Sequence, residues 1–169
     1  SNNPLAPANE ILNQLRTEII FSLKQNEKDS TSKDGMDIAF IIYNTQNNTL
    51  EYAGANNPLY IIKENSDFIE IKDDKMPIGK HISNEPFTNH IIPIENNMCI
   101  YMFSDGYADQ FGGPNRKKFK YQSLKKLIAS YHHLPASEQV HIFRQQFFEW
   151  KGNLEQIDDV LLSCIKFKA

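Results

Sequence analysis

Two pairs of residues in the sequence could hold a divalent cation. Asp105 and Gly106 follow an apolar, strand-like run, and Asp158 and Asp159 precede another. Hard divalent cations take oxygen ligands, and carboxylates at the ends of neighbouring strands can converge on one ion. The glycine lets the backbone turn sharply after Asp105. Each pair also suits an ordinary turn when it is read alone, so the metal interpretation depends on the two pairs occurring together.

Three further segments have both a functional and a plain structural interpretation. The stretch 34–37, Asp-Gly-Met-Asp, enters the first strand and offers Asp37 as a ligand, or is a polar loop that ends in a turn. The stretch 52–58 predicts a hairpin with close backbone approach, and its small residues could also leave room for a substrate. The stretch 111–114 is a flexible loop beside Asp105, either a lid or an inert connection.

Composition excludes several other classes of protein. The chain has 169 residues, 40% of them apolar, with 18 Lys and Arg against 21 Asp and Glu, which predicts one globular domain without nucleic acid as its main ligand. No apolar run approaches the roughly 20 residues that cross a bilayer, so we expect no membrane contact by this segment. The histidines form no His-Glu-x-x-His motif. Cys99 and Cys164 stand in strand-like runs as small hydrophobes, which indicates a reducing, cytoplasmic location.

Periodicity predicts helices at both ends of a series of strands. Apolar residues spaced three to four apart predict helices over 9–24, 121–131 and 136–150, with Asn9 capping the first and Val140 among the inward residues of the last. Short apolar runs separated by turn residues predict strands, and an antiparallel meander is the simplest topology. This is an α+β fold in which helices cover a mostly antiparallel sheet. The predicted strands are 38–43, 50–53, 59–63, 68–71, 87–94, 98–103 and 160–167.

Taken in order, several motifs resemble the C-terminal portion of the bacterial PPM-type serine/threonine phosphatases, in the branch that includes SpoIIE and RsbU. No single motif is specific, but together they cover the chain from about Asn9 to its end. The resemblance implies a PPM phosphatase-like layered sandwich of two antiparallel sheets flanked by helices. The motifs are Asp34-Gly35-Met36-Asp37-Ile38-Ala39, Tyr52-Ala53-Gly54-Ala55-Asn56-Asn57-Pro58, Met76-Pro77-Ile78-Gly79, residues 103–113 around Ser104-Asp105-Gly106, and Asp158-Asp159-Val160.

The resemblance also implies a reaction and assigns residues to it. Phosphatases of this type hydrolyse phosphoserine or phosphothreonine with a water held between two Mn²⁺ or Mg²⁺ ions, which lower the pKa of the water and neutralise the phosphate. Asp105 and Asp158 match the family's metal ligands, and no catalytic residue is expected beyond the metal-bound water. Gly106, Asp159 and Asp37 are assigned as further ligands or as residues that orient the ligands.

The chain departs from the family's pattern at its N-terminus. The family carries earlier strands with a Gly-Asp motif and an Asp-x-x-Gly-His-Gly-like motif, which supply a bridging aspartate and a carbonyl ligand, and nothing before Asn9 matches them. We therefore expect residues 1–169 to form a single, N-terminally truncated phosphatase domain with weak metal binding and little activity. Exposed sheet edges would favour a homodimer.

The sequence therefore predicts one of two functions. The first is a metal-dependent phosphatase module of a bacterial signalling protein, acting on a regulatory phosphoprotein such as an anti-sigma-factor antagonist. In that case the parent protein is cytoplasmic or is anchored to a membrane through an upstream sensor. The alternative is a non-catalytic module that binds a phosphoprotein or another partner. The two aspartates favour the enzyme, and the absent N-terminal motifs favour the binding module for this chain.

Overall fold

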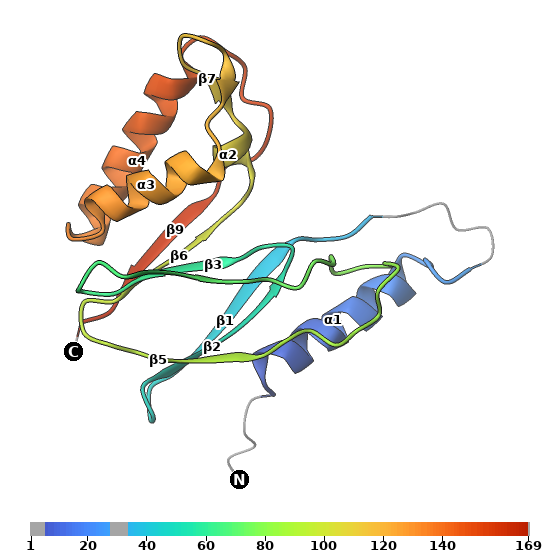
Figure 1. The fold of residues 1–169 in the computed structure, drawn as a ribbon. Helices are drawn as coiled ribbons and strands as arrows, with labels where there is room; N and C mark the ends of the chain where they lie inside the picture. Colours follow the sequence, from blue (N-terminus) through green and yellow to red (C-terminus); the bar gives the residue numbers. More distant parts are fainter. Residues whose placement is uncertain (1–5, 28–33, 169) are drawn as a thin grey trace. The chain divides into compact units, whose positions relative to one another are not determined.

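The computed structural model describes residues 6–27 and 34–168, and the chain divides into two units. Unit 1 comprises Ser1–Leu59 and Ile71–Ile94, and unit 2 comprises Tyr60–Glu70 and Glu95–Ala169. Helices and antiparallel sheets occur together (Figure 1), so the predicted α+β class is confirmed.

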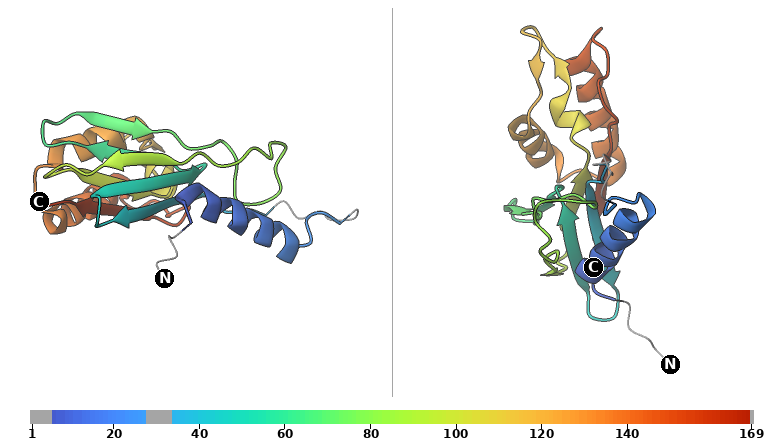
Figure 2. Two further views of the ribbon diagram at one scale, coloured as in Figure 1. Left: turned by 90° about the horizontal axis from the view of Figure 1, so that it is seen from below. Right: turned by 90° about the vertical axis from the view of Figure 1, so that its right-hand side faces the viewer.

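In unit 1 a helix covers a three-stranded sheet. Its strands are β1 (Ile38–Asn44), β2 (Thr49–Ala55) and β5 (His90–Pro93), in the order β1-β2-β5, and both pairings are antiparallel. Helix α1 (Ala8–Ser22) packs on β1 and β2 (Figure 2). Its buried Ala8 and Leu12 meet a cluster that includes Ala53, Ile78 and Phe87. Burial of this apolar stripe holds the helix on the sheet.

Unit 2 places two helices against a second antiparallel sheet (Figure 1). The sheet has the order β4-β3-β6-β9, and only the end residues Leu59 and Ile71 belong to unit 1. Its core joins aromatic and aliphatic side chains of the strands to those of the helices. The elements are β3 (Leu59–Ile62), β4 (Phe68–Ile71), β6 (Cys99–Phe103), α2 (Gly106–Asp109), β7 (Phe111–Gly112), β8 (Lys117–Lys118), α3 (Tyr121–Tyr131), α4 (Ala136–Lys151) and β9 (Leu162–Lys166).

The helix ends and faces correct two predictions. Asn9 does not cap α1, because Pro7 precedes the first helical residue with φ −54° and ψ 154°, and its fixed φ already suits a helix start. Val140 was expected inside, yet it is 51% exposed, while Phe143 and Phe147 of the same helix are buried. An apolar residue at helical spacing therefore does not guarantee burial at the edge of the apolar stripe.

The strand topology corrects two further predictions from the sequence. The predicted meander is wrong because β2 and β3 belong to different sheets, so 52–58 is not a hairpin. Its close backbone approach is real, since a Cβ at Gly54 would overlap the hydroxyl of Tyr52, which donates to the Asn57 carbonyl at 2.6 Å. Residues 87–89 also lie outside β5, where Thr88 instead donates through its N–H to Asp74 Oδ2 at 2.7 Å.

A buried amide organises the turn between α3 and α4. Gln139 is fully buried, accepts a hydrogen bond from the Tyr101 hydroxyl at 2.7 Å, and donates to the carbonyls of His132 at 3.1 Å and Leu134 at 2.9 Å. Burial raises the pKa of Tyr101 well above its usual value, so the hydroxyl remains a donor. Lys166 Nζ donates to the same two carbonyls. These bonds connect β6 and β9 to the end of α3 and the start of α4.

Replacing this amide should destabilise unit 2. Gln139→Ala leaves the Tyr101 hydroxyl and the bonded carbonyls with fewer partners in a buried place, and we expect a loss of about 2–4 kcal/mol in the free energy of unfolding. Denaturant unfolding followed by circular dichroism measures it. The control is Gln145→Ala, an exposed residue of the same helix, with an expected change below about 0.5 kcal/mol. Equal effects of the two substitutions would contradict the assigned role of Gln139.

Candidate metal-binding site

The pairing of β6 with β9 brings the two acidic motifs to the same end of one strand pair. Phe103, the last residue of β6, stands opposite Leu162, the first residue of β9. The chain therefore leaves β6 into Ser104-Asp105-Gly106 at the point where it arrives from Asp158-Asp159 into β9. The prediction that carboxylates lie at the ends of neighbouring strands is met for these motifs.

Ser104 fastens the two motifs to each other. Its N–H donates to the Leu161 carbonyl at 3.0 Å, and its hydroxyl donates to the Asp159 carbonyl at 2.7 Å. The same hydroxyl oxygen accepts from the Leu161 N–H at 2.9 Å. Neither the type nor the spacing of Ser104 in the sequence predicts this role.

Gly106 allows the two backbones to touch. A Cβ at this position would overlap the carbonyl oxygen of Asp159 and lie 3.0 Å from its carbonyl carbon and 3.3 Å from Cγ2 of Val160. A larger residue would therefore push the 159–160 segment away. Gly106 thus allows residues 159–160 to lie directly against the start of α2.

The second acidic motif makes a local turn of its own. Asp158 Oδ1 accepts a hydrogen bond from the Asp159 N–H at 2.7 Å, and the Asp158 carbonyl accepts one from Gln156 Nε2 at 2.8 Å. Asp105, Asp158 and Asp159 are all exposed to solvent. Exposed carboxylates with fixed backbones are accessible to a cation and to a large substrate.

Asp37 belongs to unit 1, not to the unit that carries the other acidic residues. Its Oδ1 accepts a hydrogen bond from Asn56 Nδ2 at 3.0 Å, and its neighbour Met36 pairs with Ile78 in an isolated bridge. Two of the motifs found in the sequence, 34–37 and 52–58, therefore contact each other through Asp37 and Asn56. This contact gives Asp37 a structural role that does not require a metal ion.

The donor set fits a hard divalent cation in type but supplies only part of a coordination shell. Asp105 and Asp158 offer the carboxylate oxygens that Mn²⁺ and Mg²⁺ take as ligands. Throughout the described ranges, 6–27 and 34–168, no group of three or more His, Cys, Asp or Glu side chains is arranged to hold a metal ion. Two carboxylates suit a weak site, because a six-coordinate cation would keep most of its waters.

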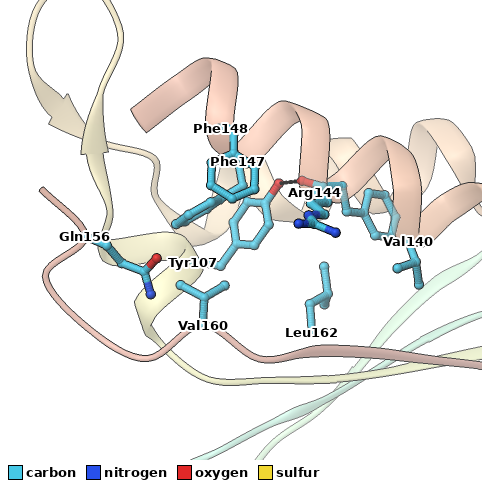
Figure 3. A pocket seen from close by; sticks show the side chains of 9 residues that line it. Tyr107, Val140, Arg144, Phe147, Phe148, Gln156, Val160 and Leu162 are labelled. Carbon is cyan, nitrogen blue, oxygen red and sulfur yellow. Dashed lines mark hydrogen bonds between the residues drawn. The ribbon is translucent and has the colours of Figure 1, made fainter. Parts of the chain in front are cut away.

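An apolar pocket of about 260 Å³ adjoins the same segments (Figure 3). Tyr107, one residue beyond Gly106, points toward α4 and donates to the Phe143 carbonyl at 2.7 Å. Burial raises the pKa of Tyr107 well above its usual value, which keeps the hydroxyl a donor. The lining contains Arg144 but no acidic side chain, so the pocket contributes no ligand for a cation.

The two cysteines lie within β6 and β9, away from the acidic motifs. Cys99 and Cys164 are both free, and Cys99 is fully buried with Sγ 3.5 Å from the His132 carbonyl oxygen. Their surroundings are the core of unit 2. The interpretation of both as small core residues agrees with this placement.

The chain is similar to a known protein family and to several solved structures. Residues 5–168 match the family described as Stage II sporulation protein E (SpoIIE). The SiaA-PP2C domain of Pseudomonas aeruginosa is similar with a TM-score of 0.84 and 23% identity, over 96% of this chain and 61% of that one. This chain therefore spans less than two thirds of that domain. No curated protein sequence matches the chain.

Two further structures share the fold at lower similarity. The phosphatase domain of SpoIIE from Bacillus subtilis matches with a TM-score of 0.60 and 11% identity, over 100% of this chain and 77% of that one. The serine/threonine phosphatase PstP/Ppp of Mycobacterium tuberculosis matches with a TM-score of 0.58 and 12% identity, over 96% and 83%. At these identities the likeness concerns the fold, which agrees with the predicted layered architecture.

The close contact at Gly106 gives a direct test of the site's geometry. Gly106→Ala should displace residues 158–160, shift their amide resonances in NMR spectra, and lower the free energy of unfolding by about 1–3 kcal/mol, because the added methyl overlaps backbone atoms. Gly152→Ala is the control. Its Cβ meets nothing within 4 Å, and its φ of 54° confines the effect to local strain of about 1 kcal/mol. Unchanged 158–160 resonances in Gly106→Ala would contradict the geometry.

Proposed function

The chain belongs to the SpoIIE family, whose structural neighbours are PP2C-type phosphatase domains, and from this we propose that it works as one domain of a metal-dependent protein serine/threonine phosphatase. The observation that carries the proposal is the close packing of Gly106 on Asp159. This contact, together with the three hydrogen bonds of Ser104, sets both acidic motifs at one sheet end. If each motif were only an ordinary turn, the two motifs would not need to lie side by side.

In this proposal Asp105 and Asp158 hold Mn²⁺ or Mg²⁺. When bound, such ions lower the pKa of a coordinated water and neutralise the phosphate, so that hydrolysis releases inorganic phosphate and a free Ser or Thr hydroxyl. Gly106 and Ser104 act as positioning residues, because they fix the backbones from which the two carboxylates project. Asp159 is assigned to orienting the neighbouring ligand, and Asp37 is the weaker assignment because Asn56 already binds its carboxylate.

The phosphatase module is proposed to belong to a bacterial signalling protein. Its proposed substrate is a regulatory phosphoprotein, such as an anti-sigma-factor antagonist. Exposure of Asp105 and Asp158 supports a protein substrate, because a phosphorylated side chain can reach them from solvent. Among the described residues, none of the helices has the length and apolar composition of a membrane span. We keep the cytoplasm as the proposed location and the homodimer as the proposed oligomeric state.

A second candidate is a module that binds a phosphoprotein without turnover. It is favoured by one observation, namely that the described residues hold no cluster of three metal ligands. The two candidates differ in what a divalent cation does. The phosphatase needs the ion at Asp105 and Asp158, whereas the binding module retains its partner without one.

Titration with Mn²⁺ tests the phosphatase proposal. We expect weak binding, seen as paramagnetic broadening of the amide signals of residues 104–106 and 158–160, and little hydrolysis of p-nitrophenyl phosphate by this chain. Asp105→Asn and Asp158→Asn should each weaken the binding at least about tenfold, because each removes one charged ligand. Asp67→Asn, another exposed aspartate of unit 2, is the control and should leave it unchanged.

Two results would count against this assignment. One is broadening that persists in both ligand variants, which would place the ion elsewhere. The other is Mn²⁺-dependent hydrolysis that Asp105→Asn does not reduce. Strong hydrolysis that Asp105→Asn abolishes would support the site and overturn only the expectation of low activity.

A further inference from the structure

A short basic hairpin follows the helix that begins beside Asp105. We call residues 111–120, which contain β7 and β8, the basic hairpin; it carries Arg116, Lys117, Lys118 and Lys120, all exposed. Lys118 pairs with Asp109 at 2.8 Å. Within the part of the chain that the structure describes, the side chains of the other three make no hydrogen bond or ion pair. Three cations are thus available to a partner.

The basic hairpin is firmly attached to α4. The Gly113 N–H donates to the Trp150 carbonyl at 2.8 Å, and Trp150 Nε1 donates to the Gln110 carbonyl at 3.0 Å. A Cβ at Gly112 would overlap that Trp150 carbonyl oxygen, so only glycine fits there. The Phe119 and Trp150 rings meet edge to face with centroids 5.4 Å apart. These contacts fix the backbone from which the charged side chains project.

Two of the cations stand on backbone that their residue types disfavour. Arg116 has φ 47°, and Lys120 has φ 74° with ψ 147°, a region that glycine occupies almost alone. Within the described chain, neither side chain makes a hydrogen bond or an ion pair that would offset this strain. Strained backbone is concentrated at functional sites, which agrees with a role of these two side chains in binding a partner.

The basic hairpin is within reach of the acidic site. The Lys120 N–H donates to the Ala108 carbonyl at 2.7 Å, and Ala108 lies three residues after Asp105, about 4.5 Å along a helix at 1.5 Å per residue. With the length of the hairpin strands and of the Lys and Arg side chains added, we estimate that the cations lie on the order of 10–20 Å from Asp105. An extended peptide spans about 3.3 Å per residue, so roughly three to six residues connect the two places.

We propose that the basic hairpin binds an acidic segment of the phosphoprotein, roughly three to six residues from the phosphorylated side chain. This deepens the proposed function and rests on it, because it names the substrate class as phosphoproteins with Asp or Glu at that spacing. Charge complementarity is the argument for the occupant. The formal charge of the whole chain is −3, which repels a long polyanion such as a nucleic acid but tolerates a short acidic segment beside a local basic patch.

Peptide binding to this chain tests the proposal. Fluorescence anisotropy compares two phosphoserine peptides, one with four Asp or Glu residues at this spacing on both sides and one with Ser in their place. We expect the acidic peptide to bind at least about tenfold more tightly at low salt, and this preference to vanish at high salt. The variant Arg116→Asn, Lys117→Ser, Lys120→Gly should lose it too, and it should fold, because Asn and Gly tolerate φ > 0.

The control variant removes the same charge elsewhere. Lys72→Ser, Lys126→Ser and Lys168→Ser remove three other exposed lysines, and we expect less than about a twofold change in binding of the acidic peptide. Thermal unfolding of both variants verifies that they are folded. Equal binding of the two peptides, or equal loss in the two variants, overturns the proposal. Tighter binding of single-stranded DNA or of anionic phosphatidylserine vesicles at the basic hairpin also overturns it, in favour of a different partner.

Failure here is distinguishable from failure of the phosphatase proposal. Binding of the unphosphorylated acidic peptide should still depend on the basic hairpin, because the hairpin contacts the acidic segment and not the phosphate. This binding should also need no Mn²⁺. The Mn²⁺ titration depends instead on Asp105 and Asp158. Loss of hairpin-dependent binding with intact Mn²⁺ binding therefore refutes only the present inference, and the reverse pattern refutes only the metal site.

Discussion

The candidate site depends on one constraint, the antiparallel register of β6 and β9. Because Phe103 faces Leu162, the residues that leave one strand and those that enter the other must meet at the same sheet end. The Ser104 hydroxyl then bridges the Asp159 carbonyl and the Leu161 N–H, so the pairing continues beyond the last ladder residues. A register shift of one residue would turn the side chains of β9 to the opposite face. The acidic site is thus a consequence of the sheet.

The same strand exit also determines where the basic hairpin goes. Tyr107, immediately after Gly106, packs its ring against Phe119 at 5.2 Å and Phe147 at 5.1 Å, and its hydroxyl donates to α4. Aromatic pairs at such distances add specificity beyond the area that they bury. Through Tyr107 the start of α2 is fixed to the helix that also holds the basic hairpin, so acidic and basic groups share one rigid support within unit 2.

The sequence predicted local features well and non-local ones poorly. The helices expected over 121–131 and 136–150 are found as α3 (Tyr121–Tyr131) and α4 (Ala136–Lys151), because local apolar spacing and turn residues determine them. The separation of β2 and β3 into two sheets was not predicted, because pairing partners far apart in sequence leave no local signal. Ser104 was missed for the same reason, since its partners lie 55 to 57 residues away. Val140 was misplaced because periodicity marks a stripe without marking its edges.

In unit 2 the acidic residues and the basic hairpin are separate in space. A phosphoprotein that approaches Asp105 and Asp158 meets like charge, which is repulsive unless a cation lies between them. By the estimate of about 10–20 Å, the basic hairpin lies more than one Debye length of about 8 Å from Asp105 at physiological salt, so its cations are largely screened from the carboxylates. Under the proposed function, the two tasks are separated in space. In this proposal, binding of the acidic segment brings the phosphate to the site, while the carboxylates keep the negative charge that a divalent ion requires.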